Sequence, residues 1–200
     1  MAVTGIFGGA FDPPHNGHVA FVRDARRRFP LDRLVILVSA DPGHKSVHLA
    51  PEIRLDLARL AFPGAEVELD EHPRTVDSLR ARRLDDPLFL IGADEFCDFL
   101  DWKDPDGVLD LSRLAVGTRP GYPQGRIDHV LEGLRRPDRV EFFEIEPVPV
   151  ASRDLRARLE RDEPVDDLVP PAVADEIRRL GLYRPGGYTE RAISARTEEH

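Results

Sequence analysis

With 200 residues, the chain is long enough for one α/β domain, and its formal net charge of -9 argues against a protein that grips nucleic acid through its phosphates. Its single cysteine excludes an intramolecular disulfide and a cysteine-rich zinc site, and no apolar run approaches the ~20 residues of a membrane span. We therefore expect a soluble, cytoplasmic protein with neither nucleic-acid nor membrane partners.

The first part of the chain alternates between strand and helix patterns. An apolar run over residues 3–8 ends in glycines and predicts a buried strand, and residues 9–16 read as a loop. Residues 17–29 carry an apolar stripe at helical spacing, and a run rich in β-branched residues over 34–39 predicts a second strand. This strand–loop–helix–strand order is the unit of a parallel sheet with a right-handed crossover.

The same alternation continues along the chain. We expect further helices over 51–61, 75–84, 94–100, 127–134, 152–160 and 171–180, and further strands over 67–69, 87–92, 113–117 and 140–145. The pattern predicts a Rossmann-like α/β fold, with an open, mainly parallel sheet and helices on both faces. We expect a single domain over residues 1–183 and a disordered tail over 184–200, where no periodic apolar pattern remains.

Ligands in such sheets bind beyond the carboxyl ends of the strands, and the first of these ends is rich in phosphate-handling features. Gly8 and Gly9 let the backbone approach a phosphate closely, and the helix that follows offers unpaired N–H groups and a positive dipole end. His15 and His18 stand three residues apart at the helix entrance, on one side of its first turn. They can donate hydrogen bonds to phosphate oxygens and stabilise charge on a transferring phosphoryl group. The alternatives are a capping histidine with an exposed neighbour, or a metal pair, which the lack of nearby cysteines disfavours.

The complete string over residues 8–18, Gly-Gly-Ala-Phe-Asp-Pro-Pro-His-Asn-Gly-His, resembles the nucleotidyltransferase signature G-G-x-F-D-P-x-H-x-G-H. Within that superfamily the chain looks most like bacterial nicotinate-nucleotide adenylyltransferases. The resemblance implies transfer of AMP from ATP to nicotinate mononucleotide, giving deamido-NAD and pyrophosphate, without a covalent nucleophile. It implies Mg²⁺ as the ATP complex, with no metal site built from side chains. It also implies that His15 and His18 are catalytic and bind ATP together with Gly8, Gly9, Ala10, Phe11, Gly92, Asp94, Ser152 and Arg156.

Further matches imply a binding site for the mononucleotide. The residues concerned are His44 and Lys45 in a segment similar to the family's P-P-H-K, Thr75 and Asp77 in a stretch similar to [ST]-x-T-x-D-T-L, Trp102, and Arg119 in an R-P-G sequence. Physically, a tryptophan in a polar loop can stack on a flat ring, and a guanidinium fits a phosphate or carboxylate bidentately. The alternatives are a solvated loop lysine, a pair of helix caps at the threonine and aspartate, and a tryptophan that packs a loop down.

One stretch departs from the family. Its I-S-S-T-x-I-R segment corresponds to residues 150–156, where Ala151 and Arg153 replace a serine and a threonine. Two hydroxyl donors are lost, at ~0.5–1.5 kcal/mol each. Ser152 remains as a helix N-cap, and Arg153 either supplies charge in compensation or points to solvent. Two alternatives therefore stay open: another phosphorylated acceptor, such as nicotinamide mononucleotide or phosphopantetheine, or a catalytically weak nucleotide-binding paralogue. A homo-oligomer is compatible with the sequence.

Overall fold

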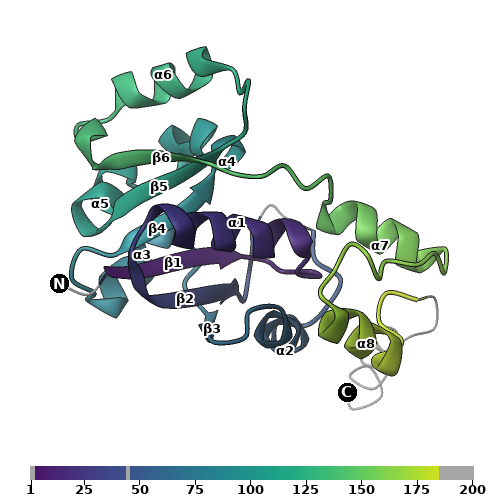
Figure 1. Ribbon diagram of the computed structural model, residues 1–200. Helices are drawn as coiled ribbons and strands as arrows, with labels where there is room; N and C mark the ends of the chain where they lie inside the picture. The colour runs from purple at the N-terminus through teal and green to yellow at the C-terminus, as the bar shows by residue number, and fades with distance from the viewer. Residues whose placement is uncertain (1–2, 44–45, 185–200) are drawn as a thin grey trace.

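The structure is a computed structural model that describes residues 3–43 and 46–184 (Figure 1). Its centre is a six-stranded sheet in the order β3-β2-β1-β4-β5-β6. The strands are β1 (Val3–Gly9), β2 (Leu31–Ser39), β3 (Glu66–Asp70), β4 (Leu88–Gly92), β5 (Arg113–Thr118) and β6 (Val140–Glu144). Every pair of neighbouring strands is parallel, which confirms the predicted Rossmann-like α/β fold.

Helices cover both faces of the sheet (Figure 1). One face packs against α1 (Asn16–Arg28), α2 (Pro51–Ala61), α7 (Ser152–Glu160) and α8 (Pro171–Leu180). The other packs against α3 (Thr75–Arg82), α4 (Ala93–Cys97), the 3-10 helix η1 (Phe99–Asp101), α5 (Pro105–Leu111) and α6 (Gln124–Gly133); a second 3-10 helix, η2 (Pro137–Arg139), precedes β6. Side chains alternate between the two cores along each strand, so that Val35 and Leu37 face α3 while Ile36 and Val38 face α1. Burial on both faces explains why the central strands read as unbroken apolar runs.

The observed elements differ from the predicted ones mainly at their ends, and in three places the difference is structural. The helix expected over 94–100 ends at Cys97 and continues as η1, and its N-cap is Gly92. Helix α5 was not predicted, because its first residues, Pro-Asp-Gly, are typical of a turn. Ser152 is the first residue of α7 rather than its N-cap. Within the described residues, no helix is long and apolar enough to cross a membrane.

The strand order reverses direction between β1 and β4. The chain runs outward from β1 through β2 to β3, then crosses back and adds β4, β5 and β6 on the other side of β1. The crossover connections leave β1 and β4 in opposite directions, so a crevice forms beyond their carboxyl ends. This is the place where open α/β sheets bind their ligands, and Gly8, Gly9, Thr75, Asp94 and Trp102, all predicted from the sequence, line a cavity there.

Candidate active site

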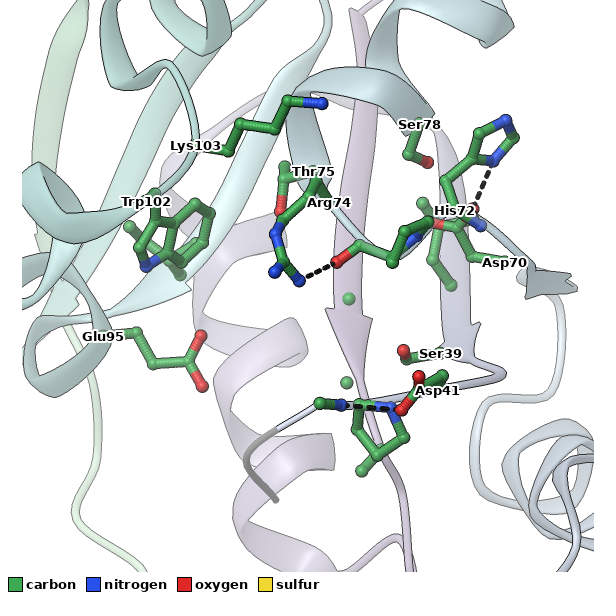
Figure 2. Close-up of a pocket in the computed structure, with 18 of the residues that line it drawn as sticks. Ser39, Asp41, Asp70, His72, Arg74, Thr75, Ser78, Glu95, Trp102 and Lys103 are labelled. Atoms are coloured by element: carbon green, nitrogen blue, oxygen red, sulfur yellow. Dashed lines mark hydrogen bonds and ion pairs between the residues drawn. The ribbon is translucent and has the colours of Figure 1, made fainter.

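A cavity of about 830 Å³ opens beyond the carboxyl ends of β1, β2 and β4 (Figure 2). Its lining includes Gly8 and Gly9 from the end of β1, Ser39 from the end of β2, and residues of the β3–α3 connection and of the segment that follows β4. A cavity of this size holds a ligand as large as a nucleotide. Its position is the one that the strand order predicts.

His15 and His18 cap helix α1 as a reciprocal pair. The His18 backbone N–H donates to Nδ1 of His15 at 3.3 Å, and the His15 backbone N–H donates to Nδ1 of His18 at 3.2 Å. The two rings stack with their centroids 3.6 Å apart and their planes 18° apart. Because each Nδ1 accepts a hydrogen bond, each ring carries its proton on Nε2, from where it can donate to an oxygen. The alternative of one capping and one merely exposed histidine is therefore wrong.

Burial keeps His15 uncharged. The residue is 7% exposed, and this desolvation lowers its pKa from 6.5 to about 4. The ring is therefore neutral at neutral pH, and it can act on an anion as a hydrogen-bond donor rather than as a cation.

The loop that carries His15 is anchored through the buried carboxylate of Asp12, which is 1% exposed. One carboxylate oxygen accepts from the Tyr183 hydroxyl at 2.8 Å, and the other accepts from the His48 backbone N–H at 2.5 Å. The carbonyl oxygen of Asp12 accepts from Nη1 of Arg156 at 2.7 Å. Burial raises the pKa of Tyr183 well above its usual value, so its phenol stays protonated and remains a donor. These contacts join three distant segments to one loop.

Helix α7 begins against the same loop. The Ser152 hydroxyl donates to the Pro13 carbonyl at 2.9 Å, and Arg156 lies alongside through its bond to Asp12. Both residues were predicted to bind ATP, and their present contacts position the loop next to that site. A contact with ATP itself stays a prediction.

The side chain of Arg153, which replaces a threonine of the family's segment, points away from the loop. Its side chain is 86% exposed and lies 3.5 Å from Asp154 in an ion pair. Of the two possibilities for this residue, the solvent-facing one is correct. The N-cap of α7 is Ala151, which supplies no side-chain cap.

The first turns of α1 and α7 lie side by side (Figure 1). A Cβ at Gly17 would come within 3.0 Å of Nδ1 of His15 and 3.2 Å of Cγ1 of Val150. A side chain here would push His15 or Val150 aside by a few tenths of an ångström, so glycine favours this close approach. Two helix N-termini with their positive dipole ends meet here, which is a favourable place for phosphate groups.

Arg54 of α2 holds the ends of β1 and β2 together, a role that the sequence interpretation missed. Its guanidinium is fully buried, and burial lowers its pKa. It donates to the carbonyl oxygens of Ala10 (2.7 Å), Ser39 (2.8 Å), Ala40 (3.1 Å) and Leu49 (3.1 Å). The signal was present in the sequence, because position 54 falls on the buried helical stripe of positions 57, 58 and 61. An arginine on such a stripe must satisfy its donors inside the protein.

The glycine-rich end of β1 faces the cavity mainly with its backbone. Gly8, Gly9 and Ala10 line it. Phe11 is only 2% exposed and packs its ring against those of Phe7 and Phe62. The ATP contact predicted for Phe11 is therefore open to its backbone and not to its ring.

Trp102 lines the opposite part of the cavity (Figure 2). Although its neighbours in the sequence are polar, its ring meets Phe99 edge to face at a centroid distance of 5.2 Å and Phe89 at 6.4 Å, so it also packs its loop down as the alternative had it. Half-buried against these two rings, the indole is fixed in place while still lining the cavity. A rigid platform of this kind suits a flat ring.

Thr75 and Asp77 have different roles at the start of α3. Thr75 lines the cavity. Asp77 is not part of the lining; it accepts from Nζ of Lys103 at 2.9 Å and thereby ties the segment that follows Trp102 to α3. The alternative reading as side-chain N-caps is wrong, since the N-cap is Arg74 and makes no capping hydrogen bond with its side chain.

Asp94 and Arg119, predicted on the ATP and the mononucleotide side respectively, contact each other. Nη2 of Arg119 lies 3.4 Å from one carboxylate oxygen of Asp94, and the Tyr122 hydroxyl donates to the other at 3.0 Å. Burial raises the pKa of Tyr122, so that phenol is also protonated. Cys97 is half-buried, with its sulfur 3.3 Å from the same hydroxyl. His44 and Lys45 lie outside the described residues, so their predicted contacts with the mononucleotide stay predictions.

Comparison with known proteins finds a matching family model and relatives of similar sequence. Residues 6–165 match the model of the cytidylyltransferase-like family. A relative from Thermus thermophilus, described as a "probable nicotinate-nucleotide adenylyltransferase", is 38% identical over 193 residues, which cover 90% of this chain and 98% of the relative. A relative of the same description from Chlorobaculum parvum is 34% identical over 197 residues, with coverage of 90% and 98%.

The fold likewise matches a solved structure. The nicotinic acid mononucleotide adenylyltransferase of Plasmodium falciparum, complexed with NaAD, aligns with a TM-score of 0.71 and 17% identity. The alignment covers 92% of this chain and 98% of the other. At this identity the match supports the fold.

Proposed function

This chain belongs to the cytidylyltransferase-like family and, within it, to the nicotinate-nucleotide adenylyltransferases, and from that premise we propose that it transfers AMP from ATP to nicotinate mononucleotide. A phosphate oxygen of the mononucleotide attacks the α-phosphorus of ATP. The new P–O bond forms as the bond to the oxygen bridging the α- and β-phosphates breaks, giving deamido-NAD and pyrophosphate. In such a reaction the protein acts by positioning the phosphates and by stabilising their charge.

The reciprocal cap of His15 and His18 is the observation that carries this proposal. Two imidazoles stand at the start of α1, each accepting a backbone N–H at Nδ1, and burial keeps the ring of His15 neutral. Their Nε2–H groups are donors suited to the charge that builds on the phosphates in the transition state. Donors that are already held in place cost no reorganisation when the reaction occurs, which makes each of them worth several kcal/mol.

In this proposal the two substrates bind to different parts of the site. The ATP phosphates lie at the joined starts of α1 and α7, close to the histidine pair, and the flat ring of the acceptor lies on Trp102. Mg²⁺ enters as the ATP complex, bound by phosphate oxygens as it usually is in such sites. Over residues 3–43 and 46–184, no group of three or more His, Cys, Asp or Glu side chains is arranged to hold a metal ion.

A coupled assay of pyrophosphate release tests the proposal. Purified protein with ATP and Mg²⁺ is offered nicotinate mononucleotide, nicotinamide mononucleotide and phosphopantetheine in parallel reactions. We expect a strong preference for nicotinate mononucleotide. Absence of pyrophosphate release with all three acceptors, in protein whose circular dichroism shows it to be folded, would refute the proposal and favour a nucleotide-binding paralogue.

A further inference from the structure

Two cationic side chains line the cavity near Trp102, and only one of them is neutralised. Lys103 pairs with Asp77 at 2.9 Å. Arg74 donates through Nη1 to the Pro73 carbonyl at 2.9 Å, and in the part of the chain that the structure describes it makes no ion pair with a carboxylate. Most of its guanidinium donors are therefore left for another group.

Three of the carboxylates that line the cavity pair with other side chains, and none of the carboxylates described there pairs with Arg74. Asp70 accepts from the His72 ring at 2.9 Å, Asp94 is held by Arg119 at 3.4 Å, and Asp98 pairs with Arg126 at 3.6 Å. In a chain with a net charge of -9, an arginine that lines a cavity without a carboxylate partner is unusual. It is suited to an anionic group of a ligand, which its planar fork can hold with two hydrogen bonds.

Figure 2 shows Arg74 and Trp102 projecting into the same part of the cavity, with Thr75 beside them. A flat ring on the indole would lie within the space that the guanidinium faces. We propose that Arg74 is a specificity-determining residue, which selects the acid form of the mononucleotide over the amide form by binding the ring carboxylate. The inference rests on the proposed function and identifies what chooses the acceptor.

The charges of the two mononucleotides explain how one arginine separates them. Both rings are pyridinium cations, which suits contact with the face of an indole. The acid form adds a carboxylate that pairs with the guanidinium, whereas the amide form leaves the guanidinium facing a positive ring without compensation. Arg74 therefore attracts one acceptor and repels the other, the combination that gives specificity.

Substitutions of Arg74 remove one exposed hydrogen bond, to the carbonyl of the adjacent Pro73, and no ion pair with a described residue. The residue is exposed and is the N-cap of α3, where its side chain makes no capping bond. Arg74→Gln removes the charge, and Arg74→Lys keeps the charge but loses the fork. Arg59→Gln is the matched control, because it removes one exposed arginine charge on α2, where the side chain pairs with Asp56 away from the cavity.

Tryptophan fluorescence gives a binding measurement that does not depend on turnover. The chain has one tryptophan, so the signal comes from the cavity wall. Each protein is titrated with nicotinate mononucleotide and with nicotinamide mononucleotide in the absence of ATP. We expect Arg74→Gln to weaken binding of the acid by about 10- to 100-fold, the effect of losing hydrogen bonds to a charged group, and to leave binding of the amide unchanged or tighter. Arg74→Lys should fall between, and Arg59→Gln should match the wild type.

Steady-state kinetics provide the second readout. The contact lies on the ring and not on the reacting phosphate, so Arg74→Gln should raise KM for nicotinate mononucleotide while kcat changes little. An acid-to-amide preference in Arg74→Gln equal to that of the wild type overturns the inference, as does a wild type that does not prefer the acid. If the wild type binds the acid but releases no pyrophosphate, the proposed reaction fails, and the binding ratios still decide the role of Arg74.

Discussion

Replacing His15 by asparagine tests whether burial keeps this ring neutral. An asparagine oxygen can still accept the His18 N–H as an N-cap, but it does not titrate. In the folded protein the His15 pKa is lowered from 6.5 to about 4 by burial, whereas the unfolded chain keeps the ordinary value. Between these two values the unfolded state binds a proton that the folded state does not. Stability from the neutral ring is therefore fully present above pH 6.5 and is lost as the pH falls toward 4.

The pKa difference sets the size of the effect. A lowering from 6.5 to about 4 corresponds to about 3 kcal/mol in full, at roughly 1.4 kcal/mol per pKa unit. The free energy of unfolding of the wild type, relative to that of His15→Asn, should drop by about 1 kcal/mol between pH values of about 7.5 and 5.5. By a pH of about 4.5 the relative drop should reach roughly 2 to 3 kcal/mol.

Urea unfolding of both proteins across this pH range measures the difference. The other titrating groups are common to the two proteins and cancel when the free energies of unfolding are subtracted. A difference that stays constant from neutral pH to about 4.5 would mean that His15 titrates as if solvated, and the burial argument would then be refuted. Because the neutral ring is the donor in the proposed reaction, kcat/KM should also show no inflection from His15 above a pH of about 5.

Two further predictions concern His18 and the loop support. His18→Asn keeps an acceptor near the position of Nδ1 but lacks the Nε2 donor, so kcat should fall ~10²-fold or more while the urea midpoint changes little. His18→Gln should show the opposite pattern, with a smaller loss of kcat and a loss of ~0.5–2 kcal/mol in unfolding free energy; the reverse order would contradict the division of roles. Tyr183→Phe removes a donor to the buried carboxylate of Asp12 and should cost about 1–3 kcal/mol in unfolding free energy. It should also lower kcat; unchanged urea melts and unchanged steady-state kinetics would show that this hydrogen bond does not support the loop.

Much of the fold could be predicted because its central strands are buried on both faces. Such strands appear as continuous apolar runs, and the helices between them carry clear apolar stripes. Helix α5 escaped prediction because it is short and begins with a local cap: the carboxylate of Asp104 accepts from the Gly107 N–H at 3.0 Å, with Asp104 itself at a φ of 53°. A sequence pattern cannot distinguish this cap from the turn that the same residues favour.

The site was predictable where a continuous motif encodes it and hidden where it depends on distant residues. The string over residues 8–18 predicted His15 and His18 at the entrance of the first helix, where the structure has them. Their mutual capping depends on ring rotamers, which surrounding packing selects. The contact of Asp12 with Tyr183 joins positions 171 residues apart, and no local pattern signals it. Arg54 was the exception, since its place on an apolar stripe could have revealed its burial.

The support of the first loop has a consequence for protein engineering. The unit formed by β1, the loop and α1 resembles a portable module, since its signature is contiguous and short. Its loop is nevertheless held by Arg156 and Tyr183, whose partners in the loop lie 144 and 171 positions earlier in the chain. A graft of the signature onto another scaffold, or a truncation before α7, would transfer the two histidines without the contacts that hold their loop in place. The proposed catalytic unit is therefore contiguous in sequence but is completed only by the whole fold.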